Sequence, residues 1–423
     1  MERKSGDIDR TVMELVMSDD IAKKKQLAKQ IFDTANAKGA YPSSVYEFYM
    51  ARGRGEFSGF TVPAINLRIM TYDLARRIFR VAQKNNSGAF VFEIARSEIG
   101  YTNQPVTEYS SMIMAAAVKE GYSGPVFIQG DHFQVNAAKF KENPDKEIEA
   151  LQSLIADAIS SGFYNIDIDS STLVDLSELD LKGQQRLNYE VCAKLTEFIR
   201  SIEPKGVTVS VGGEIGEIGH QNSTPEDLHA FMTGLKEKLR KGLAGISKIS
   251  VQTGTTHGGV VLSDGSIAQV KLDFNTLRTL SELARKEYGL AGAVQHGAST
   301  LPPEAFHKFV ECETAEVHLA TEFQNMIYES KHFPSDLKKK MYEWLKVNAA
   351  NEAKKGETEE QFLYKTRKRA TGPFKKEIMS LPQTIRDAIA DEVESKFDFL
   401  FKQLNVVNRR DLVNKYVHKS SAS

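Results

Sequence analysis

The stretch Pro125-Val-Phe-Ile-Gln-Gly-Asp-His132 decides the predicted fold of this chain. It is a short apolar run that ends in polar residues, which is typical of a strand buried in a sheet. Similar runs recur between residues 60 and 321. The predicted strands span residues 60–68, 89–95, 125–132, 165–170, 208–216, 248–255, 292–299 and 315–321.

Helical periodicity fills the gaps between these strands. Pro225 follows Ser223 and Thr224, which is favourable chemistry for a helix start. Eight alternations of strand and helix in one stretch predict an α/β protein with the (β/α)8 TIM barrel fold. The predicted helices span residues 72–85, 108–120, 146–160, 185–202, 225–241, 274–288 and 303–312.

The barrel prediction leaves a segment at each end of the chain. Residues 1–55 are predicted to form an N-terminal helical lead-in, and residues 56–330 the TIM-barrel catalytic domain. Residues 331–423 are rich in lysine and glutamate and are predicted to form a C-terminal helical extension that serves oligomerisation. The clearest helices in these end segments are predicted at residues 21–38, 335–353 and 381–404.

Composition excludes several classes of protein. The 55 basic and 56 acidic residues give a formal net charge of −1, which argues against a nucleic-acid binder and a membrane-surface protein. Cys192 and Cys312 show no metal-ligand spacing, so no disulfide framework is predicted and a reducing compartment fits best. Residues 1–9 lack the apolar core of a signal peptide, and no apolar run approaches membrane-spanning length. We therefore expect a soluble, cytoplasmic protein.

Three histidines, His132, His257 and His296, end predicted strands beside glycine or small polar residues. One histidine at a strand end is usually structural, but three in one barrel favour a metal site. Three imidazoles can hold one catalytic ion and leave a coordination position open for a substrate oxygen. Asp169 and Glu214 end the fourth and fifth predicted strands and are expected at the same face of the barrel.

Asp131 directly precedes His132, so the two side chains would face opposite sides of a regular strand. A turn at the strand end can relax that rule. A carboxylate beside a metal ligand is a candidate general base, although orientation of an imidazole or helix capping explains it equally well. Asp167 shares a face with Asp169 and points into the barrel, where it either pairs with a lysine or arginine, which we favour, or belongs to the metal environment.

Glycines and hydroxyls follow the last three predicted strands. Backbone N–H groups at such loops bind phosphate, and TIM barrels often use this sector for that purpose. The alternative is that the glycines are ordinary turn residues. The candidate phosphate-binding residues are Gly258, Gly297, Ser299 and Thr321.

In type and in order, these motifs resemble those of the class II, metal-dependent ketose-bisphosphate aldolases, which act on fructose or tagatose bisphosphates. Ala320-Thr-Glu322 is similar to the final strand of the tagatose branch, and Phe401-Lys-Gln-Leu-Asn405 to the family's C-terminal ending. The other matching segments are the opening stretch, Gly162-Phe-Tyr-Asn-Ile-Asp-Ile-Asp-Ser170, Gly213-Glu-Ile-Gly216, Thr253-Gly-Thr-Thr-His-Gly258 and His296-Gly-Ala-Ser299.

The resemblance implies roles for most of these residues. It makes Asp131 the base that accepts the proton of the hydroxyl group on the carbon whose C–C bond breaks. It also places a substrate phosphate at Gly258, Gly297, Ser299 and Thr321. Zn²⁺ is the expected ion, with Co²⁺, Mn²⁺ or Fe²⁺ as alternatives. The implied ligands are His132, His257 and His296, with Asp169 and Glu214 as an outer or alternate metal position.

The sequence departs from the family's pattern in the loop Glu217-Ile-Gly-His-Gln-Asn-Ser223. This loop holds Gln221 and Asn222 where the family has a proton-shuttle glutamate. Glu217, His220 or Glu226 could substitute for that glutamate.

Two further departures concern substrate contacts. His318 replaces an asparagine that contacts the substrate in the family, and it is either a substrate contact or a packed residue. The family's far-phosphate arginine, which comes from a neighbouring subunit in some members, has Arg367 and Arg369 as candidates here.

These observations predict a class II aldolase of carbohydrate metabolism, such as glycolysis, that cleaves a phosphorylated ketose to dihydroxyacetone phosphate and an aldehyde. A homodimer or homotetramer is expected, with no nucleic-acid or membrane partner. The first alternative is a sugar or sugar-phosphate epimerase on the same metal-dependent barrel, which the altered loop motivates. The second alternative is a non-catalytic aldolase-like subunit, although the retained histidines and Asp131 argue against it.

Overall fold

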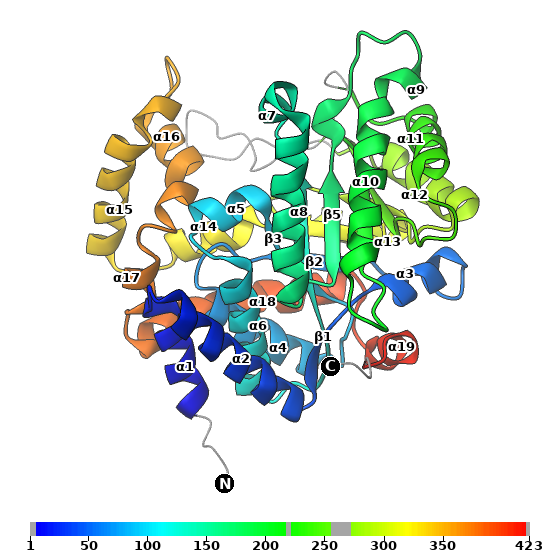
Figure 1. The fold of residues 1–423 in the computed structure, drawn as a ribbon. Coiled ribbons are helices and arrows are strands. Elements are labelled where there is room, and N and C mark those ends of the chain that lie inside the picture. Colours follow the sequence, from blue (N-terminus) through cyan, green and yellow to red (C-terminus); the bar gives the residue numbers. More distant parts are fainter. Residues whose placement is uncertain (1–5, 217–220, 255–271, 420–423) are drawn as a thin grey trace.

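The computed structural model describes residues 6–216, 221–254 and 272–419. Within them, eight parallel strands form a closed barrel (Figure 1). Each barrel strand pairs with the next along the chain, and β2 (Val62–Asn66) pairs with β9 (Glu316–Leu319) to close the ring. The predicted TIM barrel is therefore confirmed, although most strands are shorter than predicted. The strands between these two are β3 (Val91–Ala95), β4 (Gly124–Gln134), β5 (Asn165–Asp169), β6 (Ser210–Gly216), β7 (Lys248–Val251) and β8 (Ala293–Gln295).

Helices follow the strands close to their predicted positions. At the start of α11 the Thr224 hydroxyl accepts a hydrogen bond from the Asp227 amide, and Asp227 accepts one from the Thr224 amide. Residues 303–312 form a short 3₁₀ turn, Pro303–Ala305, followed by α13 (Phe306–Glu311). The other helices are α4 (Thr71–Lys84), α6 (Val106–Glu120), α8 (Pro144–Ser160), α10 (Arg186–Ile202), α11 (Pro225–Lys238) and α12 (Phe274–Tyr288), with the short α5 (Arg96–Tyr101), α7 (Ala137–Glu142) and α9 (Leu181–Gln184) between them.

The N-terminal segment packs against the barrel. Helices α1 (Gly6–Met17) and α2 (Ile21–Ala37) both lie against α6. Strand β1 (Ala40–Ser43), which the sequence analysis missed, pairs in parallel with the first residues of β4. Its four residues include Pro42 and are too few to show a strand periodicity. Helix α3 (Tyr46–Gly53) follows, and its Tyr49 hydroxyl donates to the Glu316 carboxylate inside the barrel.

The C-terminal segment completes the ring of helices. Helix α18 (Gln383–Gln403) contacts α4, α13 and α14 (Thr321–Glu329), so it takes the place of the eighth barrel helix. Two ion pairs connect it to α4: Arg386 Nη1 lies 2.9 Å from Asp73 Oδ2 in a buried pair, and Arg77 Nη2 lies 2.7 Å from Oδ1 of the partly exposed Asp387. The remaining helices are α15 (Ser335–Asn348), α16 (Glu359–Thr366), α17 (Lys375–Met379) and α19 (Arg410–Tyr416), of which α15 to α17 stand beside the barrel in Figure 1.

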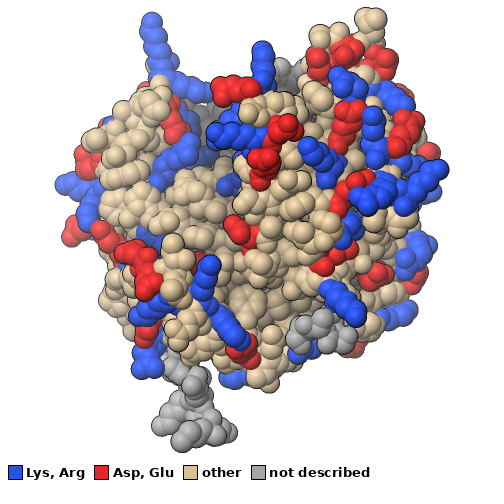
Figure 2. All heavy atoms as spheres, viewed as in Figure 1, with Lys and Arg blue, Asp and Glu red and all other residues tan. Residues whose placement is uncertain are grey.

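The surface of the molecule carries both signs of charge. Acidic and basic side chains are mixed over the face shown in Figure 2, as the near-zero net charge predicts. Within the described residues, no helix combines the length and the apolar character that crossing a bilayer requires.

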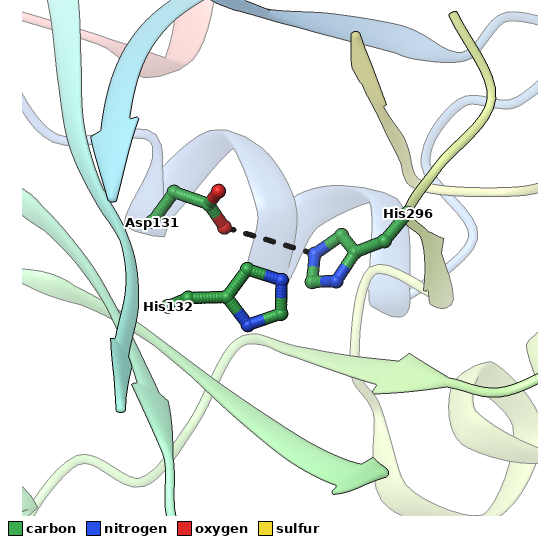
Figure 3. A group of neighbouring side chains, drawn as sticks. All are labelled: Asp131, His132 and His296. Carbon is green, nitrogen blue, oxygen red and sulfur yellow. Dashed lines mark ion pairs between the residues drawn. The ribbon is translucent and has the colours of Figure 1, made fainter. Parts of the chain in front are cut away.

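A bulge in β4 sets the direction of the side chains that matter most. Gly130 pairs with Ile166 of β5 and Phe133 pairs with Ile168, so Asp131 and His132 together oppose a single residue of β5. His132 adopts a left-handed backbone conformation with φ of 40°. The extra residue breaks the alternation of a regular strand, and both side chains point towards the same space (Figure 3).

Gly130 is required by this bulge. A Cβ added there would lie 2.5 Å from Cζ of the buried Phe133 ring. Gly130→Ala is expected to lower the free energy of unfolding by about 1–3 kcal/mol, because the bulge must shift to relieve the contact. Urea denaturation measures this change.

Gly100→Ala is the matched control, because a Cβ at Gly100 meets nothing within 4 Å. It is expected to leave the unfolding free energy unchanged or to raise it by up to about 1 kcal/mol. Equal effects of the two substitutions would contradict this account of the bulge.

Candidate active site

The candidate site lies at the carboxyl ends of the barrel strands. Asp131 and His132 come from the bulge of β4, Asp169 from the end of β5, Glu214 from β6, and His296 directly follows β8. Asp131, His132 and His296 line a pocket of about 570 Å³. Strand ends of a parallel barrel meet at one face, so residues far apart in the sequence share this site.

Two groups of potential metal ligands share His132. The rings of His132 and His296 lie 4.1 Å apart between centroids, and Asp131 Oδ1 lies 3.8 Å from His296 Nε2 (Figure 3). On its other side, His132 Nδ1 lies 3.1 Å from Asp169 Oδ2 and 3.2 Å from Glu214 Oε2. In each group of three residues, the potential ligand atoms all lie within 4.8 Å of one another.

Several predicted site residues lie outside the described part of the chain. They are His257, Gly258, Glu217 and His220. Among the described residues, the structure brings the predicted metal ligands and the predicted base together.

The electrostatics of this cluster favour a bound cation. Burial disfavours the His132 imidazolium, but the nearby carboxylates of Asp131 and Glu214 outweigh it and raise the pKa of His132 well above its usual value. Burial, with the Asp169 charge, raises the pKa of Glu214 to about 7. Burial would also raise the pKa of Asp169, but the hydrogen bond with His132 and the charge of that residue outweigh burial and lower the pKa. The cluster thus stabilises positive charge, and its imidazole and carboxylate donors suit a zinc-like divalent ion.

A second polar network fills the barrel below the site. Lys248 Nζ of β7 lies 3.0 Å from Asp167 Oδ2 and 2.5 Å from Glu316 Oε1, and it donates to Gln129 Oε1 at 2.6 Å. Asp167 is therefore paired with a lysine, as predicted. Burial opposes the charge on Lys248, but these two carboxylates outweigh it and raise the pKa of the ammonium group. The network neutralises carboxylates that water does not reach.

His318 connects the network to the site. Its Nδ1 lies 3.0 Å from Glu93 Oε2 and 3.2 Å from Asp131 Oδ1, while its Nε2 lies 2.7 Å from Glu316 Oε1. Burial opposes its protonation, but Glu93 and Asp131 outweigh it and raise the pKa of His318 well above its usual value. His318 lines the pocket and holds Asp131 Oδ1 in place. It is thus both packed in a network and exposed to a ligand in the pocket.

Three of the predicted phosphate-binding residues, Gly297, Ser299 and Thr321, line the same pocket. Arg367 does not. Its guanidinium lies 4.4 Å from the centre of the Tyr364 ring and 3.2 Å from Glu329 Oε1, so aromatic stacking and an ion pair hold it among the C-terminal helices.

The sequence analysis missed further residues that line the pocket: Asn66, Arg68, Glu98, Tyr101 and Lys368. Arg68 ends the predicted strand at residues 60–68, so the signal that singled out the histidines, a polar residue at a strand end, also applied to it. Lys368 carried no such signal, because it reaches the pocket from the C-terminal segment.

The sequence model of the class-II fructose-bisphosphate aldolase family matches residues 54–402. The chain belongs to this family. The family is generally metal-dependent, which agrees with the buried groups of potential ligands around His132. No curated protein sequence matches the chain.

Solved structures with a similar fold include enzymes of more than one activity. The fructose-bisphosphate aldolase of Campylobacter jejuni is 18% identical, with a TM-score of 0.51 over 88% of this chain and 96% of that one. The fructuronate-tagaturonate epimerase UxaE of Cohnella laeviribosi is 11% identical, with a TM-score of 0.56 over 94% of this chain and 86% of that one. At these identities the likeness shows a common fold.

Metal binding by this aldolase-family protein is expected to strengthen as pH rises. The raised pKa of His132 means that the imidazole carries a proton at neutral pH, and an ion must displace that proton. For each proton that the ion displaces, the metal affinity rises about tenfold with each unit of increasing pH, as long as the pH is below the pKa of the group that holds the proton. Below about pH 7, Glu214 adds a second proton and steepens the dependence.

Calorimetric titration with Zn²⁺ between about pH 6 and about pH 8 measures this dependence. His132→Ala should remove most of the affinity. His332→Ala changes an exposed histidine on the C-terminal segment and should leave it intact. A pH-independent affinity in the unaltered protein would refute the proton competition.

Replacement of Lys248, the buried lysine inside the barrel, should make the protein easier to unfold. Lys248→Met leaves Asp167 and Glu316 buried without their cation, which is expected to cost about 3–5 kcal/mol of unfolding free energy. Lys340→Met removes an exposed pair with Glu377, where the expected loss is below about 1 kcal/mol. Chemical denaturation compares the two, and a loss at Lys248 as small as that at Lys340 would contradict the role of the network.

Proposed function

We propose that this protein is a metal-dependent class II aldolase. In this proposal it cleaves a phosphorylated ketose of the fructose or tagatose 1,6-bisphosphate type to dihydroxyacetone phosphate and an aldehyde. The observation that carries the proposal is the position of Asp131, a carboxylate beside the adjoining imidazoles of His132 and His296 in one pocket. A base next to a metal-type donor set suits a reaction that removes a hydroxyl proton as a C–C bond breaks.

Asp131 is the proposed base. Burial opposes its ionisation, but the charges of His132 and His318 outweigh it and hold the pKa of this carboxyl well below its usual range. Asp131 is therefore ionised at neutral pH and available to accept the proton of the substrate hydroxyl. The contact between His318 Nδ1 and Asp131 Oδ1 keeps the carboxylate in one orientation.

His132 and His296, with His257 from outside the described residues, would hold the ion. When bound, a divalent ion such as Zn²⁺ would supply Lewis-acid polarisation of the ketone. Asp169 and Glu214 orient the His132 ring through its Nδ1, and they are also an alternate position for an ion. Gln134 donates to Asp169 Oδ2 at 2.5 Å and so fixes that carboxylate in turn.

The phosphate of the substrate is proposed to lie at the β8–β9 side of the pocket. Gly297 follows β8 with a positive φ of 68°, a turn that exposes backbone N–H groups. Ser299 and Thr321 add hydroxyl groups at the same wall. These donors suit an anionic oxygen.

A second candidate is an epimerase that cleaves or enolises its substrate and re-forms the bond on the other face. His318 favours it, because this histidine places a second proton-carrying group on the pocket wall beside Asp131. The fructuronate-tagaturonate epimerase UxaE of Cohnella laeviribosi has a similar fold. The loop after β6 agrees with this alternative, since Gln221 and Asn222 are amides that cannot shuttle a proton.

The aldolase is tested with fructose and tagatose 1,6-bisphosphates and coupled detection of triose phosphate. We expect Zn²⁺-dependent release with at least one of them, and loss of release when a chelator is added. Asp131→Asn should lower kcat by about 100-fold or more while zinc remains bound. Silence with both substrates would reject the aldolase, and a sugar product of unchanged mass would select the epimerase.

A further inference from the structure

Two cationic side chains from distant parts of the chain meet on the pocket wall. Arg68 follows β2, and Lys368 lies in the 3₁₀ turn Arg367–Ala370 that follows α16. Both line the pocket that holds Asp131 and the histidines. In Figure 1 the C-terminal helices that carry this turn stand beside α5, which continues from β3 at the same end of the barrel.

Arg68 is held in a fixed direction. Its Nε donates to Glu98 Oε1 at 2.7 Å, and its Nη1 donates to Thr321 Oγ1 at 3.4 Å. Glu98 is itself fixed, because its Oε2 accepts from Asn66 Nδ2 at 2.6 Å and from the Ala95 amide at 2.9 Å. The guanidinium therefore lies directly beside a residue of the proposed phosphate site.

Lys368 lacks the carboxylate partner that the nearby Lys365 and Arg369 have. None of the ion pairs among the described residues includes it, and its ammonium nitrogen lies 6.0 Å from the centre of the Tyr101 ring. Burial, together with the charges of Arg68 and Arg369, lowers the pKa of this half-buried group. A cation in that position is stabilised by an anion in the pocket.

The pocket carries charges of both signs. The carboxylates of Asp169 and Glu214 contact His132, whereas Arg68 and Lys368 bring two positive charges to the same pocket. An anionic group of a ligand is therefore expected beside Arg68 and Lys368.

We propose that Arg68 and Lys368, with the Thr321 hydroxyl, bind the phosphate of the substrate in the same chain that carries the metal ligands. This proposal rests on the proposed function for the identity of the substrate, but phosphate binding itself requires no turnover. Guanidinium, ammonium and hydroxyl donors arriving from separate elements suit a tetrahedral anion better than a planar carboxylate. The C-terminal segment thereby contributes a residue that recognises the substrate.

The test is calorimetric titration of the zinc-loaded, full-length protein with inorganic phosphate, and separately with acetate. Lys368→Met is expected to weaken phosphate binding about tenfold, because a charge-assisted hydrogen bond is lost. This variant is suited to the test, since Lys368 holds no ion pair whose loss would disturb folding. Arg68→Gln should weaken phosphate binding at least as much.

The matched control is Lys355→Met, which removes the same charge from an exposed position of the C-terminal segment and should change the affinity by less than about twofold. Phosphate binding by Lys368→Met within about twofold of the unaltered protein would overturn the proposal. So would acetate binding that equals phosphate binding and responds equally to Lys368→Met.

The two proposals fail separately. If neither bisphosphate is cleaved but Lys368→Met still loses phosphate binding, the aldolase is rejected and the anion site stands. If cleavage occurs and Lys368→Met binds phosphate and substrate normally, the aldolase stands and the anion site is rejected.

Discussion

The active centre depends on the pairing of β4 with β5, in which two residues of one strand oppose a single residue of the other. That bulge turns Asp131 and His132 towards the same space, and the left-handed backbone at His132 costs about 1–3 kcal/mol. The residues on either side of the bulge offset this cost. The buried Phe133 ring packs against Gly130, and regular pairing with β5 resumes at Phe133. The proposed base and a proposed metal ligand, which are neighbours in the sequence, thus face one shared space.

Charge is balanced in layers along the barrel axis. At the bottom, Lys248 neutralises Asp167 and Glu316, and the Tyr49 hydroxyl satisfies Glu316 from the N-terminal segment. Above it, His318 lies between this layer and Asp131, while burial raises the pKa of the neighbouring Glu93 above its usual value. The hydrogen bonds and ion pairs of each layer orient the side chains of the layer above it. The site is therefore oriented in part by groups, such as Lys248 and Tyr49, that do not line the pocket.

The sequence predicted the barrel because each of its eight strands and most of its helices carry their own local pattern. It also predicted that Asp131, His132 and His296 would meet, since the carboxyl ends of parallel strands share one face. Contacts between segments that are distant in the sequence could not be predicted from such local patterns. Arg367 and Lys368 are neighbours in a basic stretch, yet only Lys368 lines the pocket, because the direction of each side chain depends on a 3₁₀ turn and on the aromatic ring that stacks on Arg367. The place of α18 in the ring was equally hidden, since α14 to α17 intervene after β9.

The position of α18 bears on how the protein is made. The first barrel strand, β2, needs β9 as its neighbour, and α4 needs α18, which ends at Gln403. A nascent chain leaves the ribosome from its N-terminus, so the face of α4 that contacts α18 stays uncovered until the chain has been synthesised through Gln403. Until then the barrel has an open edge, and such edges are where incomplete chains aggregate. Truncated products of translation would accordingly depend on chaperones to remain dispersed.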